Sequence, residues 1–156
     1  MEFQPRRILW PTDFSETSLC AARYARALCR KFGAELHVVH VVPPPLNPDV
    51  NIMFAGEAPL LVSETDLADA SKRGLNRLIE KHLDNDAAIV RDICFGNPWT
   101  AICEYAKKHE IDMLVITTHG RTGFSHALIG STAERIVQHA PCPVLTVKQK
   151  ERDCLK

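Results

Sequence analysis

The run Glu35–Val42, with the sequence ELHVVHVV, is almost continuously apolar and rich in β-branched residues. Such a run is typical of a central strand in a parallel sheet, where helices cover both faces. His37 and His40 interrupt the run, and their spacing of three places them on opposite faces of a strand. We therefore expect two hydrogen-bonded core histidines here and not a metal-binding pair. The chain should fold around a buried sheet that lies between layers of helices.

Apolar runs with strand character alternate with segments of helical periodicity along the chain. The predicted strands are Ile8–Trp10, Glu35–Val42, Ala88–Phe95, Met113–Thr118 and Val144–Val147. The predicted helices follow Ser15, Ser63, Asn97 and Gly130. This order predicts a single α/β domain over residues 1–148, followed by a charged tail at 149–156. The expected architecture is a three-layer sandwich with a five-stranded parallel sheet and helices on both faces.

The first helix has clear boundary signals. Asp13 and Glu16 have the spacing of a capping box, and Ser15 is an alternative N-cap. Gly33 is placed to end the helix. The face that we expect to be buried carries the residues Leu19, Cys20, Tyr24, Ala27, Leu28 and Phe32.

The segment Ala88–Phe95 alternates and contains two charged residues, Arg91 and Asp92. Charges within a strand argue for the edge of a sheet and against its centre. Asn97 and Pro98 then have the positions of an N-cap and a first helical residue. With this strand at the edge, the expected strand order is 3-2-1-4-5.

The composition excludes several classes of function. Lysine plus arginine equals aspartate plus glutamate, at 19 each, so the basic surplus typical of nucleic-acid-binding proteins is missing. The longest apolar run, Val38–Val42, is broken by His40, so we expect no membrane span. No apolar segment of a secretory signal follows Arg6 and Arg7, which favours a cytoplasmic protein.

The six cysteines form no C-x-x-C pair, and most lie in apolar or helical patterns. We interpret them as buried thiols, with Cys154 in the charged tail as the most exposed. The segment Pro43–Val62 is a long loop with an apolar content too high for a solvated linker. It either covers a surface of the same fold or contacts a partner subunit.

In an open parallel sheet, ligands bind at the carboxyl ends of the strands, where the strand order reverses. In the order 3-2-1-4-5 that point lies between the first and fourth strands. The residues that we expect to meet there, with the end of the second strand, are Pro11, Thr12, Asp13, Val41, Thr117, Thr118, His119, Gly120, Arg121, Gly130, Ser131 and Thr132.

These residue types suit a nucleotide. Asp13 can accept a hydrogen bond from an exocyclic amine or a ribose hydroxyl, and backbone groups near Val41 can pair with a base edge. His119 and Arg121 are candidate charge partners for phosphates. The residues that can cradle phosphates through backbone and hydroxyl groups are Gly120, Gly130, Ser131 and Thr132.

Each of these residues also has a purely structural interpretation. Asp13 taken alone is better explained as a helix cap, and Ser131 with Glu134 has capping-box spacing. No Walker sequence G-x-x-x-x-G-K-[ST] is present, and no nucleophile stands beside a general base. His119 is the only attractive acid–base candidate, and a phosphate contact is its simpler role. The convergence of these residues on one point of the sheet indicates a nucleotide site.

Four motifs together resemble the universal stress protein family. They are PTDFSE after the first strand, LHVVHVV as the second, GNP before the third helix, and THGRTGF…IGSTAERIVQHAPCPVLTV. The resemblance covers nearly the whole chain. It implies an adenine nucleotide alpha hydrolase-like fold and a homodimer that pairs through the last strand, Val144–Val147. It also implies an ATP site in those members that carry the motif G-x-x-G-x9-G-[ST].

The match to that motif has one departure. Gly120, Gly130 and Ser131 occupy its later positions, whereas Thr117 replaces the first glycine. A β-branched side chain there crowds a phosphate or ribose, although its hydroxyl can also donate a hydrogen bond. The resemblance further assigns Asp13 and the residue Val41 to adenine contacts. A Mg²⁺ ion that accompanies ATP would be held through the phosphates.

The sequence thus predicts a cytoplasmic, dimeric stress-response protein that binds ATP as a regulatory ligand, with hydrolysis slow or absent. The alternative is a nucleotide-free protein–protein interaction module, in which Thr117 disables the site. A third hypothesis is a true ATPase with His119 in catalysis.

Overall fold

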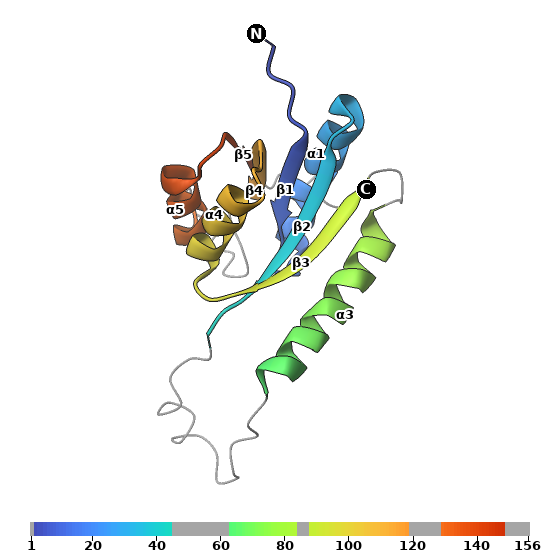
Figure 1. The fold of residues 1–156 in the computed structure, drawn as a ribbon, viewed down its shortest axis with the longest axis vertical. Helices are drawn as coiled ribbons and strands as arrows, with labels where there is room; N and C mark the ends of the chain where they lie inside the picture. The colour runs from blue at the N-terminus through green and yellow to red at the C-terminus, as the bar shows by residue number, and fades with distance from the viewer. Residues whose placement is uncertain (1, 45–62, 84–87, 119–128, 149–156) are drawn as a thin grey trace.

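The computed structural model of the protein describes residues 2–44, 63–83, 88–118 and 129–148. A five-stranded parallel sheet lies at its centre, in the order β3-β2-β1-β4-β5 (Figure 1). The strands are β1 (Arg7–Pro11), β2 (Glu35–Val42), β3 (Ile89–Phe95), β4 (Met113–Thr117) and β5 (Val144–Val147). The helices are α1 (Glu16–Phe32), α3 (Glu64–His82), α4 (Pro98–Lys108) and α5 (Ser131–His139). The predicted fold class and strand order are confirmed.

Helices cover both faces of the sheet, and each face has its own apolar core. One core joins α1 and α3 to Ile8 and Trp10 of β1 and to alternate residues of the neighbouring strands. The other joins α4 and α5 to Leu9 of β1 and to the intervening strand residues. In Figure 1, α4 and α5 lie side by side on one face of the sheet. The three predicted layers are therefore present.

Strand β2 is buried along almost its whole length, as its apolar sequence predicts. Its two histidines face opposite cores, and each has a hydrogen-bond partner. His37 Nδ1 lies 2.9 Å from the hydroxyl of Tyr105 on α4, and His40 Nδ1 lies 2.8 Å from the carbonyl oxygen of Thr12. The expectation of two hydrogen-bonded core histidines is confirmed.

Helix α1 begins and ends at predicted residues, and its predicted buried face is confirmed in part. Ser15 is the N-cap, and Gly33 ends the helix with a φ of 67°. The buried residues are Ser18, Cys20, Ala21, Ala22, Ala25 and Cys29, whereas Tyr24 is 48% exposed and Ala27 is also exposed. Cys20 is buried as predicted, and Leu19, Leu28 and Phe32 are partly buried against the core. Most of the fully buried residues are small, which lets the helix pack closely against β1 and β4.

The cysteines differ in state. Cys29, Cys94, Cys103 and Cys142 are free, and burial raises the pKa of the Cys29 thiol to about 12. Cys20 is buried but disulfide-bonded, so the prediction of a thiol is wrong there. A helical apolar pattern predicts that a cysteine is buried. It does not distinguish a free thiol from a disulfide, because either can be buried. The predicted loop Pro43–Val62, from residue 45 on, and Cys154 lie outside the described residues.

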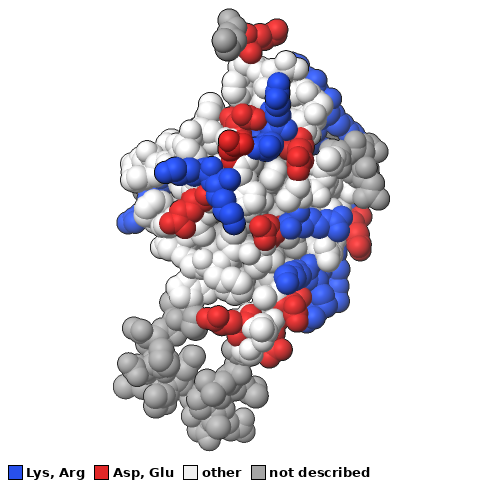
Figure 2. All heavy atoms as spheres, viewed as in Figure 1, with Lys and Arg blue, Asp and Glu red and all other residues white. Residues whose placement is uncertain are grey.

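Charges of both signs are interspersed over the face shown in Figure 2. No stripe of one sign crosses this face, in keeping with the formal net charge of zero. Within the described part of the chain, no helix has the length and apolar character needed to cross a membrane.

Candidate functional site

A cavity of about 360 Å³ opens at the carboxyl ends of β1 and β4. This volume falls within the roughly 300–1,000 Å³ range of ligand pockets. Every described residue that we predicted for the site lines it: Pro11, Thr12, Asp13, Val41, Thr117, Thr118, Gly130, Ser131 and Thr132. The remaining three predicted residues, His119, Gly120 and Arg121, lie outside the described residues. A cavity is therefore present at the point where the strand order reverses, between β1 and β4. Ligand binding there stays a prediction.

The turn after β1 forms one wall of the cavity. The N–H of Thr12 donates to the carbonyl of Val39 at 2.8 Å, which extends the β1–β2 pairing into the wall. Asp13 Oδ1 accepts from the N–H of Ser15 at 3.0 Å and from the Ser15 hydroxyl. Ser15, in turn, caps α1 by accepting from the N–H of Ser18. Ser15, and not Asp13, is thus the N-cap. Its hydrogen bonds orient the Asp13 carboxylate within the cavity wall.

The end of β4 and the start of α5 form the opposite wall. The N–H of Thr118 donates to Val147 at 3.2 Å, while its carbonyl accepts from the N–H of Gly130 at 2.7 Å. These bonds join β4, β5 and the first turn of α5 at one place. Thr117, at the position of the motif's first glycine, also lies in the cavity wall.

Helix α5 starts without the predicted capping box. Gly130 is the N-cap, so Ser131 is the first helical residue and cannot cap it. Glu134 accepts instead from Gln138 at 3.5 Å, along the exposed side of the helix. A glycine has no side-chain acceptor, so it leaves the N–H groups of the first turn to another acceptor. That arrangement, with the positive end of the helix dipole, fits an anion.

The floor of the cavity is apolar, and most of it was not predicted as part of the site. The apolar residues concerned are Pro98, Ile102, Ile116, Ala133 and Ile136, and the polar Ser18 is a further unpredicted lining residue. Ile116 had a detectable signal, because it lies in the predicted strand Met113–Thr118. That signal assigned it to the core, and only the structure shows that it also borders the cavity. An apolar floor between polar walls is common in sites for ring-shaped ligands.

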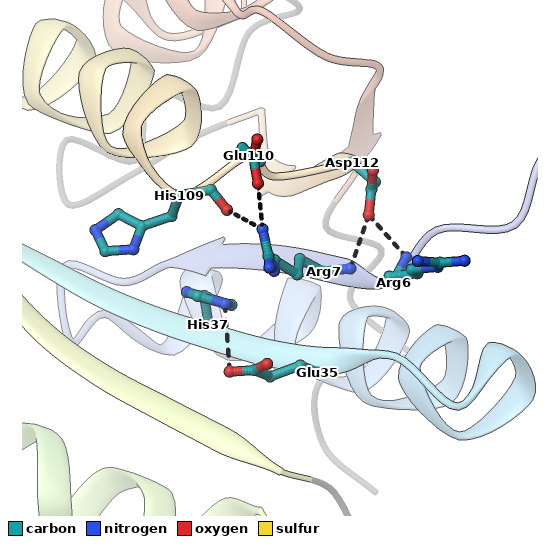
Figure 3. Close-up of polar contacts among 7 residues, drawn as sticks. All are labelled: Arg6, Arg7, Glu35, His37, His109, Glu110 and Asp112. Atoms are coloured by element: carbon teal, nitrogen blue, oxygen red, sulfur yellow. Dashed lines mark hydrogen bonds and ion pairs between the residues drawn. The ribbon is translucent and has the colours of Figure 1, made fainter.

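The amino ends of the strands, at the opposite edge of the sheet, carry a cluster of charged and aromatic groups (Figure 3). Asp112 Oδ2 accepts from the backbone N–H groups of Arg6 and Arg7 at 2.8 and 2.9 Å. The Arg7 guanidinium donates to the carbonyl of His109 and to Glu110, both at 3.0 Å. These contacts tie the start of β1 to the segment that leads into β4.

Beside this cluster, His37 is 4% exposed and lies between two partners. Its Nδ1 faces the Tyr105 hydroxyl, and its Nε2 lies 3.6 Å from Glu35 Oε1. Burial lowers the pKa of His37, and the nearby Glu35 carboxylate partly opposes this effect. Burial also raises the pKa of Tyr105. Both rings are therefore neutral near pH 7 and act as packed, hydrogen-bonded core residues.

No group of three or more histidine, cysteine, aspartate or glutamate residues that could hold a metal ion occurs within residues 2–44, 63–83, 88–118 and 129–148.

Comparison with known proteins places this geometry in a family. The model of the universal stress protein family matches residues 5–148, nearly the whole chain. The chain belongs to the universal stress protein family. Its sheet order and helix layers are those of the adenine nucleotide alpha hydrolase-like fold found in universal stress proteins.

Individual universal stress proteins resemble the chain over most of their length. Universal stress protein MJ0531 of Methanocaldococcus jannaschii is 33% identical over 148 residues, which cover 95% of this chain and 85% of the relative. The structure of MJ0577 from the same organism matches with a TM-score of 0.75 at 26% identity, and covers 94% of this chain and 98% of that one. The universal stress protein from Archaeoglobus fulgidus, solved in complex with dAMP, has the same fold, with a TM-score of 0.64 at 19% identity, covering 94% and 100%.

Proposed function

We propose that the protein binds ATP in the cavity between β1 and β4 as a regulatory ligand. The observation that carries the proposal is the convergence of the described motif residues on one cavity. Asp13 and Val41 come from one side of the sheet reversal, and Gly130 and Ser131 from the other. Their sequence positions are far apart, yet they line one cavity.

The cavity offers different chemistry to the two ends of a nucleotide. The phosphates would lie at the N-terminus of α5, where Gly130 brings the backbone close and Ser131 and Thr132 add hydroxyl groups. The base and ribose would lie against Val41 and the apolar floor, within reach of Asp13. Mg²⁺, when it accompanies ATP, would be held through the phosphates.

An adenine nucleotide is also supported by the family. The universal stress protein from Archaeoglobus fulgidus shares this fold and was solved in complex with dAMP. The similarity between the two proteins is one of fold. In this chain the strand order reverses between β1 and β4, where the cavity lies. We therefore favour an adenine nucleotide over other anions, and ATP because the later motif glycines and the serine are in place.

A regulatory role, and not rapid turnover, suits the lining of the cavity. Asp13 is the one ionisable side chain among the described lining residues, and its Oδ1 already accepts from Ser15. A general base needs a side chain that can take up a proton at the reacting group. Hydrolysis is accordingly expected to be slow or absent, and we propose a cytoplasmic role in the response to stress.

We further propose a homodimer that pairs through β5. The two edges of the sheet differ in how open they are to another strand. On β3, Arg91 and Asp92 are exposed, and Asp92 Oδ1 accepts from the N–H of Ile93 at 2.8 Å. A side chain that occupies an edge amide blocks pairing with a second strand. The strand β5, VLTV, carries no charge.

The register of β5 identifies its outward groups. The carbonyls of Pro143 and Val147 accept from β4, so the alternate residues Val144 and Thr146 direct their backbone groups outward. Replacing Thr146 with proline would remove an outward donor and leave the β4 pairing intact. Light scattering should then show a monomer for Thr146→Pro and a dimer for the unmodified protein. A dimer in both would exclude pairing through β5.

The nucleotide proposal is tested by the nucleotide content of freshly purified protein and by an ATP titration in a calorimeter. The expected result is one ATP bound per chain, with an affinity reduced by at least tenfold in Asp13→Ala, because a hydrogen bond to a charged group is worth about 1.5–3 kcal/mol. An unchanged affinity in Asp13→Ala would show that the site is wrong. No binding at millimolar ATP would support the nucleotide-free interaction module, in which Thr117 closes the site.

A further inference from the structure

Phe14, at the edge of the cavity, has an unusual backbone conformation. Its φ of 64° lies in the left-handed region, which bulky residues rarely adopt. Phe14 stands between Asp13 of the cavity wall and Ser15, the N-cap of α1. A strained conformation of this kind persists only where the surrounding contacts hold it in place. The contacts of Phe14 therefore identify what holds the turn between β1 and α1.

Hydrogen bonds hold the turn from within. The N–H of Phe14 donates to Thr12 Oγ1 at 3.1 Å, and the N–H of Ser15 donates to Asp13 Oδ1 at 3.0 Å. Thr12 Oγ1 also lies 2.8 Å from the Ser18 hydroxyl on α1. These bonds fix the shape of the turn, and the bond from the Thr12 N–H to the Val39 carbonyl ties its start to β2.

His40, on β2, ties the turn to the sheet at a second point, the carbonyl of Thr12. Its Nδ1 lies 2.8 Å from the carbonyl oxygen of Thr12, and a carbonyl can only accept, so Nδ1 carries the proton and donates. The imidazole also stacks on the Phe14 ring, with centroids 4.1 Å apart and ring planes at 31°. His40 is 8% exposed, so little water competes for this bond. The bond ends on the peptide group that leads directly to Asp13.

Gly74, on α3, stands behind the Phe14 ring. A Cβ added at Gly74 would lie 3.4 Å from Phe14 Cζ, so a methyl group would just touch the ring and a longer side chain would displace it. No described residue of α3 lines the cavity. Among the described residues, the ring of Phe14 thus connects α3 to the turn that forms the cavity wall.

We propose that His40 and Phe14 form a clamp that sets the Thr12–Asp13 backbone for ligand binding and couples α3 to the site. The nucleotide part of this proposal rests on the proposed function, whereas the clamp itself does not. His40 and Phe14 are positioning residues, because they act through the wall and are not among the lining residues. A shift of α3 would move the Phe14 ring, loosen the His40 bond and weaken the site.

The first test compares His40→Asn with His40→Leu by calorimetry. An asparagine amide places a donor near the Nδ1 position, whereas leucine fills the space without one. His40→Leu should weaken ATP binding about tenfold, the scale of one lost hydrogen bond, and His40→Asn should stay within about threefold. Tripolyphosphate, which has no base or ribose, should bind both variants as it binds the unmodified protein. Equal losses in the two variants, or for the two ligands, would overturn the clamp.

The second test approaches the clamp from α3. Gly74→Ala should leave the ATP affinity unchanged and raise the melting temperature, since alanine favours helix over glycine. Gly74→Leu should weaken ATP binding about tenfold by displacing the ring, although residue 74 touches no ligand. An unchanged ATP affinity in a folded Gly74→Leu protein would show that α3 is not coupled to the site.

The third test needs no nucleotide. Hydrogen exchange, followed by NMR at the amides of Phe14 and Ser15, should be about tenfold faster in His40→Leu and Gly74→Leu and unchanged in His40→Asn. Circular dichroism confirms that each variant is folded. An unchanged exchange rate in His40→Leu would show that there is no clamp. If the unmodified protein bound no ATP, the proposed function would fail, while the exchange rates would still decide this inference.

Discussion

The two ends of the same parallel sheet are built in opposite ways. At the amino ends of the strands, charged and aromatic side chains such as Arg7, His37 and Asp112 contact partners in neighbouring elements (Figure 3). At the carboxyl ends of β1 and β4, short side chains and Gly130 border a cavity of about 360 Å³. One end is closed by its own contacts, and the other leaves room for a ligand.

This difference separates stability from binding. Contacts at the amino end join β1 to the entrance of β4 and so support the sheet order. The carboxyl end keeps backbone groups, hydroxyl groups and a helix N-terminus directed toward a hollow. Substitutions at the carboxyl end should therefore change ligand affinity, and substitutions at the amino end should change the free energy of unfolding.

The largest expected effect is at the carboxyl end. Ser131→Asp places a carboxylate at the first residue of α5, where a phosphate would otherwise lie. We expect ATP affinity to fall about a hundredfold through charge repulsion. The same change should raise the free energy of unfolding by about 0.3–1 kcal/mol, because an acidic residue favours a helix N-terminus.

Calorimetry and urea unfolding measure these two quantities, and Ser131→Ala is the matched control without charge. If Ser131→Asp kept the ATP affinity of the control, phosphates would not lie at the α5 N-terminus.

At the amino end, Asp112→Ala should change stability and leave ligand binding alone. The substitution leaves the backbone N–H groups of Arg6 and Arg7 without their acceptor. We expect the free energy of unfolding to fall by about 2 kcal/mol. Urea unfolding gives this value, and Asp112→Asn, which keeps an acceptor oxygen, should lose less. A loss of ATP affinity in the folded variant would contradict the separation of the two ends.

The amino end should also make the protein sensitive to acid. The unfolded chain binds a proton at His37 with the ordinary pKa of 6.5, whereas burial lowers this pKa in the folded protein. Below that pH the unfolded state binds more protons, so stability falls as the pH is lowered toward the folded-state pKa. Urea unfolding from pH 7.5 to about 5 should show this slope.

In His37→Asn, which cannot titrate but keeps a polar partner for Tyr105, the slope should be smaller. A slope of the same size in both proteins would assign the acid sensitivity to other groups.

The smallest effect concerns Thr117. Thr117→Gly restores the family motif, and removing the β-branched side chain from the cavity wall should raise ATP affinity about threefold. The free energy of unfolding should fall by about 0.5–1 kcal/mol, because glycine weakens a strand. Thr117→Ser is the control that keeps the hydroxyl. Lower affinity in Thr117→Gly would mean that the threonine hydroxyl contributes a bond to the ligand.

Much of the fold could be predicted because its signals are local. The apolar run of β2, the charges Arg91 and Asp92 in β3 and the cap Ser15 each report on their own surroundings, and the order of elements then determines the sheet. The buried face of α1 could not be predicted in the same way. Alanine is common in helices whether buried or exposed, so the choice of Ala21 and Ala25 depends on how closely α1 approaches the sheet.

The cavity was predictable in its polar walls and not in its floor. The walls follow from strand ends that share one edge of the sheet, whereas the floor depends on the packing of α4 beside α5. The choice of Gly130 over Ser131 as the N-cap likewise depends on the bond from Gly130 to Thr118, between residues on different elements.

The most direct test of the central assignment is an NMR titration of the ¹⁵N-labelled protein with ATP. The account predicts saturable shifts at Thr12, Asp13, Thr118 and Ser131, and none at Arg7, His37 or Asp112 beyond those of a salt control. Shifts centred on the amino end, or no shifts at millimolar ATP, would contradict it.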